Sequence, residues 1–368
     1  MKPMSYFSLI VLFLSCAKST NINQNANIQL SFINEYIVPD SLFIDDTPIG
    51  GLSGIDYANN LFYMVVDDPI NPRYLKATID FKNDQISNIN FNNVVLFKDT
   101  VSNFGKENSL DLEGIFVDEN TQEIFFISEG HIKSKKNPSI FSTDSLGYFN
   151  QSFGVPTMFN ANSPNKPKNN ASFEGLSKSV DGKGFWVAME GPLQSDGEHP
   201  SLKKTSSPIR VTYFDISSKK ATKQFAYPLE NITNPAKGSV NLNGVTAILE
   251  YAKNKFLIME RTYQSGYGMD GNIIRIFNVL FDENVTNTLE INSLKETEYK
   301  LVKKELLLDL STIKNQLKFK VVDNLEGIAI GPTLSNGHKS ILLVADNNFQ
   351  KYGQQLNQFL LLDFKNLP

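Results

Sequence analysis

The sequence predicts an all-β fold, a single β-propeller with five blades. Three observations predict it: a short motif recurs five times, each copy precedes an apolar run that ends in an acidic residue, and helical periodicity is scarce. Successive copies are spaced from 60 residues (Gly54 to Gly114) to 83 residues (Gly244 to Gly327). This spacing suits one four-stranded sheet for each copy, with loops of variable length.

Each copy of the motif holds an apolar residue, a small or acidic residue, a glycine and a second apolar residue. The five copies are Leu52–Ile55, Leu112–Ile115, Phe173–Leu176, Leu242–Val245 and Leu325–Ile328. The apolar runs that follow them end in Asp67, Glu129, Glu190, Glu260 and Asp346. From glycine to closing acid the distance is 13 to 19 residues, which is the length of a β-hairpin.

Further strand-like runs lie between the hairpins and supply the outer strands of the blades. After the fifth hairpin only one such run remains, Gln358–Phe364, whereas Ile28–Val38 near the N-terminus has no partner of its own. We expect these two segments to pair and close the ring, because closure removes open sheet edges. A six-bladed propeller, with the extra blade inside 281–310 or 160–172, is the alternative. Only Thr286–Glu305 has helical character.

The N-terminus predicts export. Met1-Lys2 precedes an apolar run, Tyr6–Leu14, that is too short to span a bilayer and is typical of a signal peptide over residues 1–15. The only cysteine, Cys16, follows a small residue, and this pattern resembles the bacterial lipobox. The resemblance implies lipidation of Cys16, a tether over 16–27, and a propeller domain over 28–368 held at the bacterial cell envelope, on the periplasmic or outer-membrane surface. An ordinary signal peptide with an incidental cysteine is the alternative.

Composition excludes several classes of function. The chain has 39 Asp and Glu against 35 Lys and Arg, a net charge of −4, which argues against nucleic acid as a partner. A single cysteine cannot form an internal disulfide or a zinc knuckle, and the three histidines leave little material for histidine chemistry. The sequence has no GxSxG, HExxH or P-loop motif. Any chemistry must therefore depend mainly on carboxylates.

The hairpins predict where these carboxylates meet. In a hairpin, the first residues of one strand neighbour the last residues of the next, and the innermost strands of a propeller surround its axis. We therefore expect a ring of up to eight carboxylates, or nine with Asp68. The eight are Asp67, Glu113, Glu129, Glu174, Glu190, Glu260, Glu326 and Asp346.

Such a ring would need a cation, because like charges repel strongly in a low dielectric. Oxygen ligands without His or Cys favour Ca²⁺ or Mg²⁺ over zinc. Arg261 is the one built-in cation expected at this face. The alternative for each acid taken singly is a structural role, in which it accepts hydrogen bonds from the backbone of the next blade.

Six motifs in order resemble the phytase-like family described as having esterase-like activity. They are Gly50–Ile55 (GGLSGI), Asp111–Ile115 (DLEGI), Phe173–Leu176 (FEGL), Glu260-Arg261, Asp323–Pro332 (DNLEGIAIGP) and Asp346–Phe349 (DNNF). The resemblance covers about residues 50–364. It implies a secreted or periplasmic propeller, similar to calcium-dependent propeller phytases, that hydrolyses phosphoesters or related esters. The resemblance does not identify which residues would be catalytic.

Residues and resemblance together lead to one expected function and one alternative. The first is a Ca²⁺-dependent hydrolase of a small anionic phosphoester or ester, with Glu129 and Glu190 as bases and Arg261 stabilising developing charge. The alternative is a non-enzymatic propeller that binds a ligand or partner at the cell surface. The metal ligands expected for the hydrolase are Asp67, Glu113, Glu174, Glu260, Glu326 and Asp346.

Overall fold

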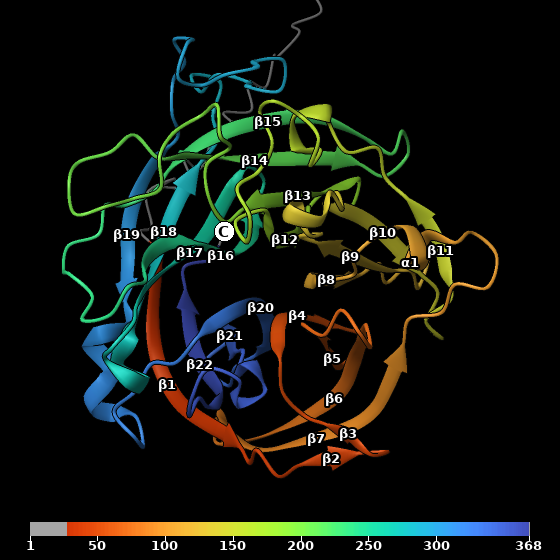
Figure 1. Cartoon of the computed structure of the whole chain (residues 1–368). Coiled ribbons are helices and arrows are strands. Elements are labelled where there is room, and N and C mark those ends of the chain that lie inside the picture. The colour runs from red at the N-terminus through yellow and green to blue at the C-terminus, as the bar shows by residue number, and fades with distance from the viewer. Residues whose placement is uncertain (1–27, 368) are drawn as a thin grey trace, which may run out of the picture.

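The computed structural model describes residues 28–367, which form a five-bladed β-propeller (Figure 1). Blade 1 consists of β4 (Leu52–Ala58), β5 (Leu61–Val66), β6 (Arg73–Lys82) and β7 (Gln85–Leu96). Blade 2 consists of β8 (Leu112–Val117), β9 (Ile124–Ser128), β10 (Ser139–Thr143) and β11 (Phe149–Ser152). Blade 3 consists of β12 (Phe173–Lys178), β13 (Gly184–Met189), β14 (Pro208–Asp215) and β15 (Lys220–Pro228). Blade 4 consists of β16 (Asn241–Ala252), β17 (Lys255–Gln264), β18 (Asn272–Leu280) and β19 (Lys303–Asp309).

The N-terminal strand completes blade 5, as predicted. This blade consists of β20 (Leu325–Thr333), β21 (Lys339–Ala345), β22 (Asn357–Lys365) and β1 (Gln29–Val38). β1 pairs antiparallel with β22 from Gln29 opposite Lys365 to Val38 opposite Asn357. The pairing joins the two ends of the described chain, so the ring is closed between its first and last elements. Five four-stranded sheets account for the blades of residues 28–367, and the six-bladed alternative is wrong.

Little else in the described chain is regular. A two-stranded hairpin, β2 (Phe43–Ile44) and β3 (Thr47–Pro48), precedes blade 1, and α1 (Phe104–Glu107) precedes blade 2. The helical character expected for Thr286–Glu305 is wrong: residues up to 302 form an irregular loop, and β19 begins at Lys303. This loop is tied down by tertiary bonds such as that from the Thr288 N–H to the Gln224 carbonyl, 2.9 Å, which override weak helical propensity. Short 3₁₀ turns occupy Ile132–Ser134, Thr157–Phe159, Gly268–Gly271, Leu310–Gln316 and Asn348–Gln350.

The innermost strand of each blade contains a bulge that defines the true register of the repeat. In blades 1, 2, 3 and 5 the bulge follows the first residue of the motif, as between Leu112 and Gly114. In blade 4 it lies between Val245 and Ala247. The fourth copy of the motif is therefore Val245–Ile248, three residues later than Leu242–Val245. The sequence misled here because the β16–β17 hairpin continues beyond the bulge, pairing Asn241, Leu242 and Asn243 with the end of β17.

Close approach of the inner strands explains the glycine of the motif. A Cβ on Gly114 would lie 2.6 Å from the Cβ of Leu176 in blade 3, and one on Gly54 would lie 2.9 Å from the Glu113 carbonyl oxygen in blade 2. Real side-chain atoms do not approach so closely, so these positions require glycine. Farther from the axis, buried apolar side chains fill the space between blades. Trp186 of blade 3, for example, packs in an edge-on arrangement against Phe256 of blade 4.

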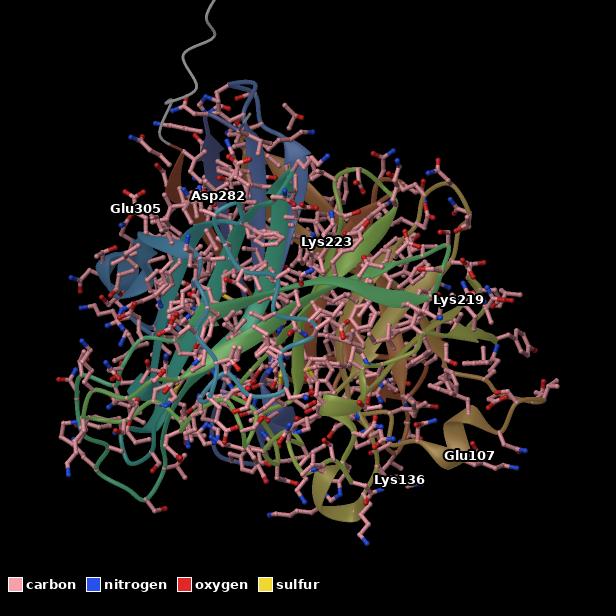
Figure 2. All side chains as sticks on the ribbon, turned by 90° about the horizontal axis from the view of Figure 1, so that it is seen from above. Glu107, Lys136, Lys219, Lys223, Asp282 and Glu305 are labelled. Atoms are coloured by element: carbon pink, nitrogen blue, oxygen red, sulfur yellow. The ribbon has the colours of Figure 1, made fainter. Side chains whose placement is uncertain are left out.

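The two ends of the propeller carry different loops. Glu107 and Lys136 lie together at one end of the molecule, well away from Lys219 in the β14–β15 turn (Figure 2). The Lys136 ammonium donates a 2.6 Å hydrogen bond to the backbone carbonyl of Glu107. Among residues 28–367, no helix has the length and apolar character that a membrane crossing requires.

Candidate functional site

Each blade contributes two positions to one end of the propeller axis. The first is the bulge residue of the inner strand. The second, here called the closing residue, comes directly after the residue of the neighbouring strand that pairs with the first residue of the motif; it follows that strand in blades 1, 2, 3 and 5 and lies within β17 in blade 4. The corrected register makes the bulge residues Ser53, Glu113, Glu174, Thr246 and Glu326. By the same register the closing residues are Asp67, Glu129, Glu190, Arg261 and Asp346.

Backbone hydrogen bonds hold the closing residues of blades 1, 2, 3 and 5 in equivalent places. In each case the closing N–H donates to the carbonyl of the residue just before the inner strand, over 2.7 to 3.0 Å. The acceptors are Gly51, Asp111, Ser172 and Asn324. Ten positions around the axis therefore carry seven carboxyl groups and one guanidinium. The seven, here called the carboxyl ring, are Asp67, Glu113, Glu129, Glu174, Glu190, Glu326 and Asp346.

Seven of the eight predicted acids lie in this ring, and Glu260 does not. Glu260 comes one residue before the closing position of blade 4, so its side chain points away from the axis, and it is 2% exposed. Its carboxylate accepts hydrogen bonds from the Tyr227 hydroxyl, 2.6 Å, and the Asn243 amide, 2.7 Å, and it pairs with the Lys304 ammonium at 2.7 Å. These partners come from blades 3 and 4, so Glu260 joins two blades and does not contribute to the ring.

Arg261, the closing residue of blade 4, is the cation of the ring. It forms an ion pair and hydrogen bond with Glu326 and donates a hydrogen bond to the Asn324 amide oxygen. Its second terminal nitrogen lies 3.6 Å from a Glu190 oxygen. Arg261 therefore connects blade 4 to blades 3 and 5, and the nearby carboxylates raise its already high pKa.

The two neutral bulge residues have a structural role. The Ser53 hydroxyl donates a 2.8 Å hydrogen bond to the Leu112 carbonyl of blade 2, and the Thr246 hydroxyl donates a 3.0 Å bond to the Leu325 carbonyl of blade 5. Both bonds run from one inner strand to the next. They stabilise the contact between blades without adding charge to the axis.

Burial and mutual repulsion raise the pKa values of the carboxyl ring. Burial, followed by a hydrogen bond and repulsion from Asp111, raises the pKa of Asp67 to about 8. Burial, with repulsion from Asp111 and then Glu190, raises the pKa of Glu129 to about 9. Burial raises the pKa of Glu190 to about 7, although the Arg261 charge opposes this shift.

The other four carboxyls of the ring show the same effect. Burial, and then repulsion from Glu174, raises the pKa of Glu113 well above its usual value. Burial also raises the pKa of Glu174, Glu326 and Asp346, with neighbouring carboxylates adding to it. Without a cation, the ring must therefore hold several protons at neutral pH.

One acid of the site was missed by the sequence analysis. Asp111 precedes β8, and its carboxyl hydrogen-bonds that of Asp67. Oxygens of Asp67, Asp111 and Glu113 all lie within 4.8 Å of one another. The signal was present in the sequence, because Asp111 immediately precedes the second motif, but hairpin geometry predicts only the acids inside the motif and at the end of the apolar run.

The donor set fits a hard cation. Oxygens bound to one Ca²⁺ at 2.3 to 2.6 Å lie at most about 5 Å apart, which is the spacing of the three acids above. In addition, the Oε2 atom of Glu129 is buried and has no hydrogen-bond partner, in a residue that is 8% exposed. A buried carboxylate oxygen without a partner is costly, so this atom is available to a cation or a proton.

The space on the axis is narrow. A cavity of about 10 Å³ is lined by the five bulge residues and the two residues that follow each of them. This volume has room for about one water molecule and is far below the ~300 to 1,000 Å³ of usual pockets for organic ligands. The axis can therefore hold ions, water or one small group of a ligand, and any larger part of a ligand must lie outside it.

Several solved structures are similar to this chain at low sequence identity. Among solved structures, a β-1,3-galactosidase of glycoside hydrolase family 43 with galactodeoxynojirimycin has a TM-score of 0.45 and 10% identity, over 89% of this chain and 93% of its own. An exo-β-1,3-galactanase from Phanerochaete chrysosporium has a TM-score of 0.43 and 10% identity, over 91% and 64%. The Dos1 propeller has a TM-score of 0.37 and 8% identity, over 86% and 69%. At these values the likenesses do not bear on activity.

Sequence comparison is more informative. No curated protein matches the chain. The family model described as "Phytase-like: Esterase-like activity of phytase" matches residues 47–349. The match includes the inner strands of all five blades and every member of the carboxyl ring. Because it spans most of the sequence, the chain belongs to the phytase-like family.

Proposed function

We propose that this protein is a Ca²⁺-dependent hydrolase of phosphoesters or related small anionic esters, and that the carboxyl ring is its active site. The observation that carries the proposal is the convergence of seven carboxyls, five of them buried and two half-buried, with a single guanidinium at the same ten positions. Membership of the phytase-like family supports the hydrolase class. The concentration of acidic groups supports a cation, because the single guanidinium of Arg261 can offset the charge of only part of the ring.

Asp67, Asp111 and Glu113 are the residues best arranged to hold the cation, and Glu174, Glu326 and Asp346 would contribute charge around it. Carboxylate oxygens are the ligands that Ca²⁺ prefers. A bound Ca²⁺ supplies positive charge that stabilises negative charge developing on an ester oxygen.

The remaining side chains supply proton transfer and orientation. Glu190, with a pKa of about 7, can accept a proton near neutral pH, which is where a general base is most effective. Glu129 has an oxygen without a partner and can accept a proton from a bound water. Arg261 positions Glu190 and Glu326, and its charge stabilises negative charge near them.

A panel of phosphoesters and carboxylic esters tests the proposal. With Ca²⁺ we expect turnover that a chelator abolishes, and Glu190→Gln and Glu129→Gln should each lower kcat by about 10²- to 10⁴-fold, as expected for loss of an acid–base group. Glu305→Gln, at an exposed position of β19, is the matched control and should leave kcat unchanged (Figure 2).

The narrow axial cavity favours a second candidate, a propeller that binds a ligand or cation without turning it over. In that case no ester would be hydrolysed with or without Ca²⁺, and the hydrolase proposal would be refuted. Calcium would still raise the melting temperature of the wild-type protein, and Glu113→Gln with Glu174→Gln would remove that increase.

The expected lipid anchor falls in residues 1–27, outside the described part of the chain. We propose export, lipidation of Cys16 and attachment to the bacterial cell envelope, as the sequence of the N-terminus indicates. In cells fed radiolabelled palmitate, the wild-type protein should carry label and remain with the membrane fraction. Cys16→Ser should lose both label and membrane attachment, and label on the variant would contradict the assignment.

A further inference from the structure

Side chains of three positions come together at a junction between neighbouring blades. They are the closing residue of one blade, the bulge residue of the next, and the residue just before the motif of the next, here called the leading residue. At the junction of blades 1 and 2 these are Asp67, Glu113 and Asp111. Their oxygens lie within 4.8 Å of one another, and they form the cation site proposed above.

The junction of blades 4 and 5 already contains a cation. Arg261 closes blade 4, and its guanidinium donates hydrogen bonds to the side chains of Asn324 and Glu326, the leading and bulge residues of blade 5. At this junction the leading and bulge positions therefore present side-chain oxygens to a positive charge. The same two positions can serve a cation at another junction if their residues carry oxygen ligands.

The junction of blades 2 and 3 carries oxygen ligands at all three positions. Glu129 closes blade 2, and Ser172 and Glu174 are the leading and bulge residues of blade 3. The inner strands β8 and β12 lie side by side near the axis (Figure 1). The Glu129 carboxylate accepts a hydrogen bond from the Ser172 N–H and repels the Glu174 carboxyl. Carboxylate and hydroxyl oxygens are ligands of hard cations.

Two oxygens at this junction are buried without a partner. The Ser172 hydroxyl, in a residue with 0% exposure, and the Oε2 atom of Glu129 have no hydrogen-bond partner among residues 28–367. Unpaired polar atoms in the interior cost free energy, so a native structure usually gives them a ligand, a water or a proton. A cation bound between the two side chains would satisfy both oxygens.

The two remaining junctions are poorer in ligands. Each has one carboxyl, and its leading residue is a glycine, which has no side chain. The Thr246 and Ser53 hydroxyls at the bulge positions already donate hydrogen bonds to the next inner strand. The closing and leading residues are Glu190 with Gly244 and Asp346 with Gly51.

We propose that the junction of blades 2 and 3 is a second site for a hard divalent cation, held by Glu129, Ser172 and Glu174. The inference rests on the proposed function for the identity of the ion, Ca²⁺. Two carboxylates and a neutral hydroxyl carry less negative charge than three carboxylates, so this site binds Ca²⁺ more weakly than the junction of blades 1 and 2. While the ion is bound, Glu129 is a ligand, and Glu190 remains as the proton acceptor of the ring.

Calorimetric titration of the metal-free protein with Ca²⁺ at pH 7 counts the ions. We expect two binding steps in the wild-type protein. Glu129→Gln should remove the weaker step, and Asp111→Asn should remove the stronger one. A single bound ion in the wild-type protein, or loss of the same step in both variants, would overturn the second site.

Ser172→Ala tests the hydroxyl ligand. Without Ca²⁺ this variant loses an unpaired buried hydroxyl, so its melting temperature should equal or exceed that of the wild-type protein. With Ca²⁺ the weaker step should lose affinity by about tenfold or more, because even a hydrogen-bond partner of a metal ligand contributes that much.

Ser139→Ala is the matched control. Ser139 in β10 also has a buried hydroxyl without a partner, but it occupies none of the three positions at a junction. Its removal should leave both Ca²⁺ steps unchanged, and equal effects of the two serine variants on Ca²⁺ binding would overturn the role of Ser172.

The number of bound ions is measured independently of ester turnover. Two bound ions without hydrolysis of any ester would support the second site and refute the proposed reaction. Hydrolysis by a protein that binds one ion would support the reaction and refute the second site.

Discussion

Blade 4 differs from the other four blades in the residues that it places at the propeller axis. Blades 1, 2, 3 and 5 each present a closing acid, and their motifs carry glycine where inner strands approach. Blade 4 presents Thr246 at the bulge, Ala247 in place of the glycine and Arg261 in place of the closing acid. The difference shows that the ring is not a uniform repeat, because one blade supplies the charge that the others require.

The consequence is electrostatic. Arg261 lies between Glu190 of blade 3 and Glu326 of blade 5, so its positive charge offsets the negative charge of these two carboxylates. The acids of blades 1 and 2, Asp67, Asp111, Glu113 and Glu129, lie on the side of the ring without a guanidinium contact. The cation site proposed above lies on that side.

We expect the largest loss of unfolding free energy when the positive charge of blade 4, on Arg261, is removed. Arg261→Met keeps much of the apolar stem but leaves Glu326 and Glu190 buried without their cation, which should cost about 3 to 5 kcal/mol of unfolding free energy. Urea unfolding at pH 7 without Ca²⁺ measures it. Arg275→Met in the adjacent strand removes a more exposed pair with Asp309, 3.1 Å, and should cost much less. Equal losses in the two variants would contradict the role assigned to Arg261.

The acid of blade 3 should give the protein a characteristic pH dependence. Glu190 has a pKa raised to about 7, so without Ca²⁺ the folded protein keeps a proton that the unfolded chain releases above about pH 4.5. Stability is therefore full below pH 4.5 and falls as pH rises to 7, by roughly 3 kcal/mol from this group. Glu190→Gln should flatten the unfolding free energy over this window, whereas Glu305→Gln should not. A wild-type stability that rises from pH 4.5 to 7 would refute this view.

The smallest effect concerns the glycine of the motif. Gly114→Ala places a Cβ 2.6 Å from that of Leu176 and should cost about 1 to 3 kcal/mol through overpacking. Ala247→Gly in blade 4 removes a tolerated methyl group and should cost only about 0.5 to 1 kcal/mol. The melting temperatures of both variants are measured at pH 5, so that the effect of packing on stability is separated from the effect of the ring's charge. If Gly114→Ala were neutral, the inner strands would not be packed as described.

Much of this architecture could be predicted from local pattern. The alternation of motif, apolar run and acid predicted five blades, because each hairpin is specified by residues close in sequence. The unpaired segment Ile28–Val38 predicted ring closure. All seven acids of the carboxyl ring followed from the same hairpin geometry, which also placed Glu260 there wrongly.

The exceptions arise where local pattern and long-range packing disagree. Leu242–Val245 matches the motif better than Val245–Ile248, yet pairing with β17 selects the second. That three-residue shift moves Glu260 out of the ring and Arg261 into it. Asp111 was missed because its importance depends on contact with Asp67 in another blade.

The sequence by itself determined the blade count, the closure of the ring and the abundance of acids at hairpin ends, since these depend on periodicity and on neighbours along the chain. Only the tertiary structure decided that Glu260 leaves the axis and pairs with Lys304, that Asp111 lies beside Asp67, and which carboxylates the Arg261 guanidinium contacts. The physical reason is that charge interactions depend on distance and burial, and at the axis both are set by strands that are far apart in sequence.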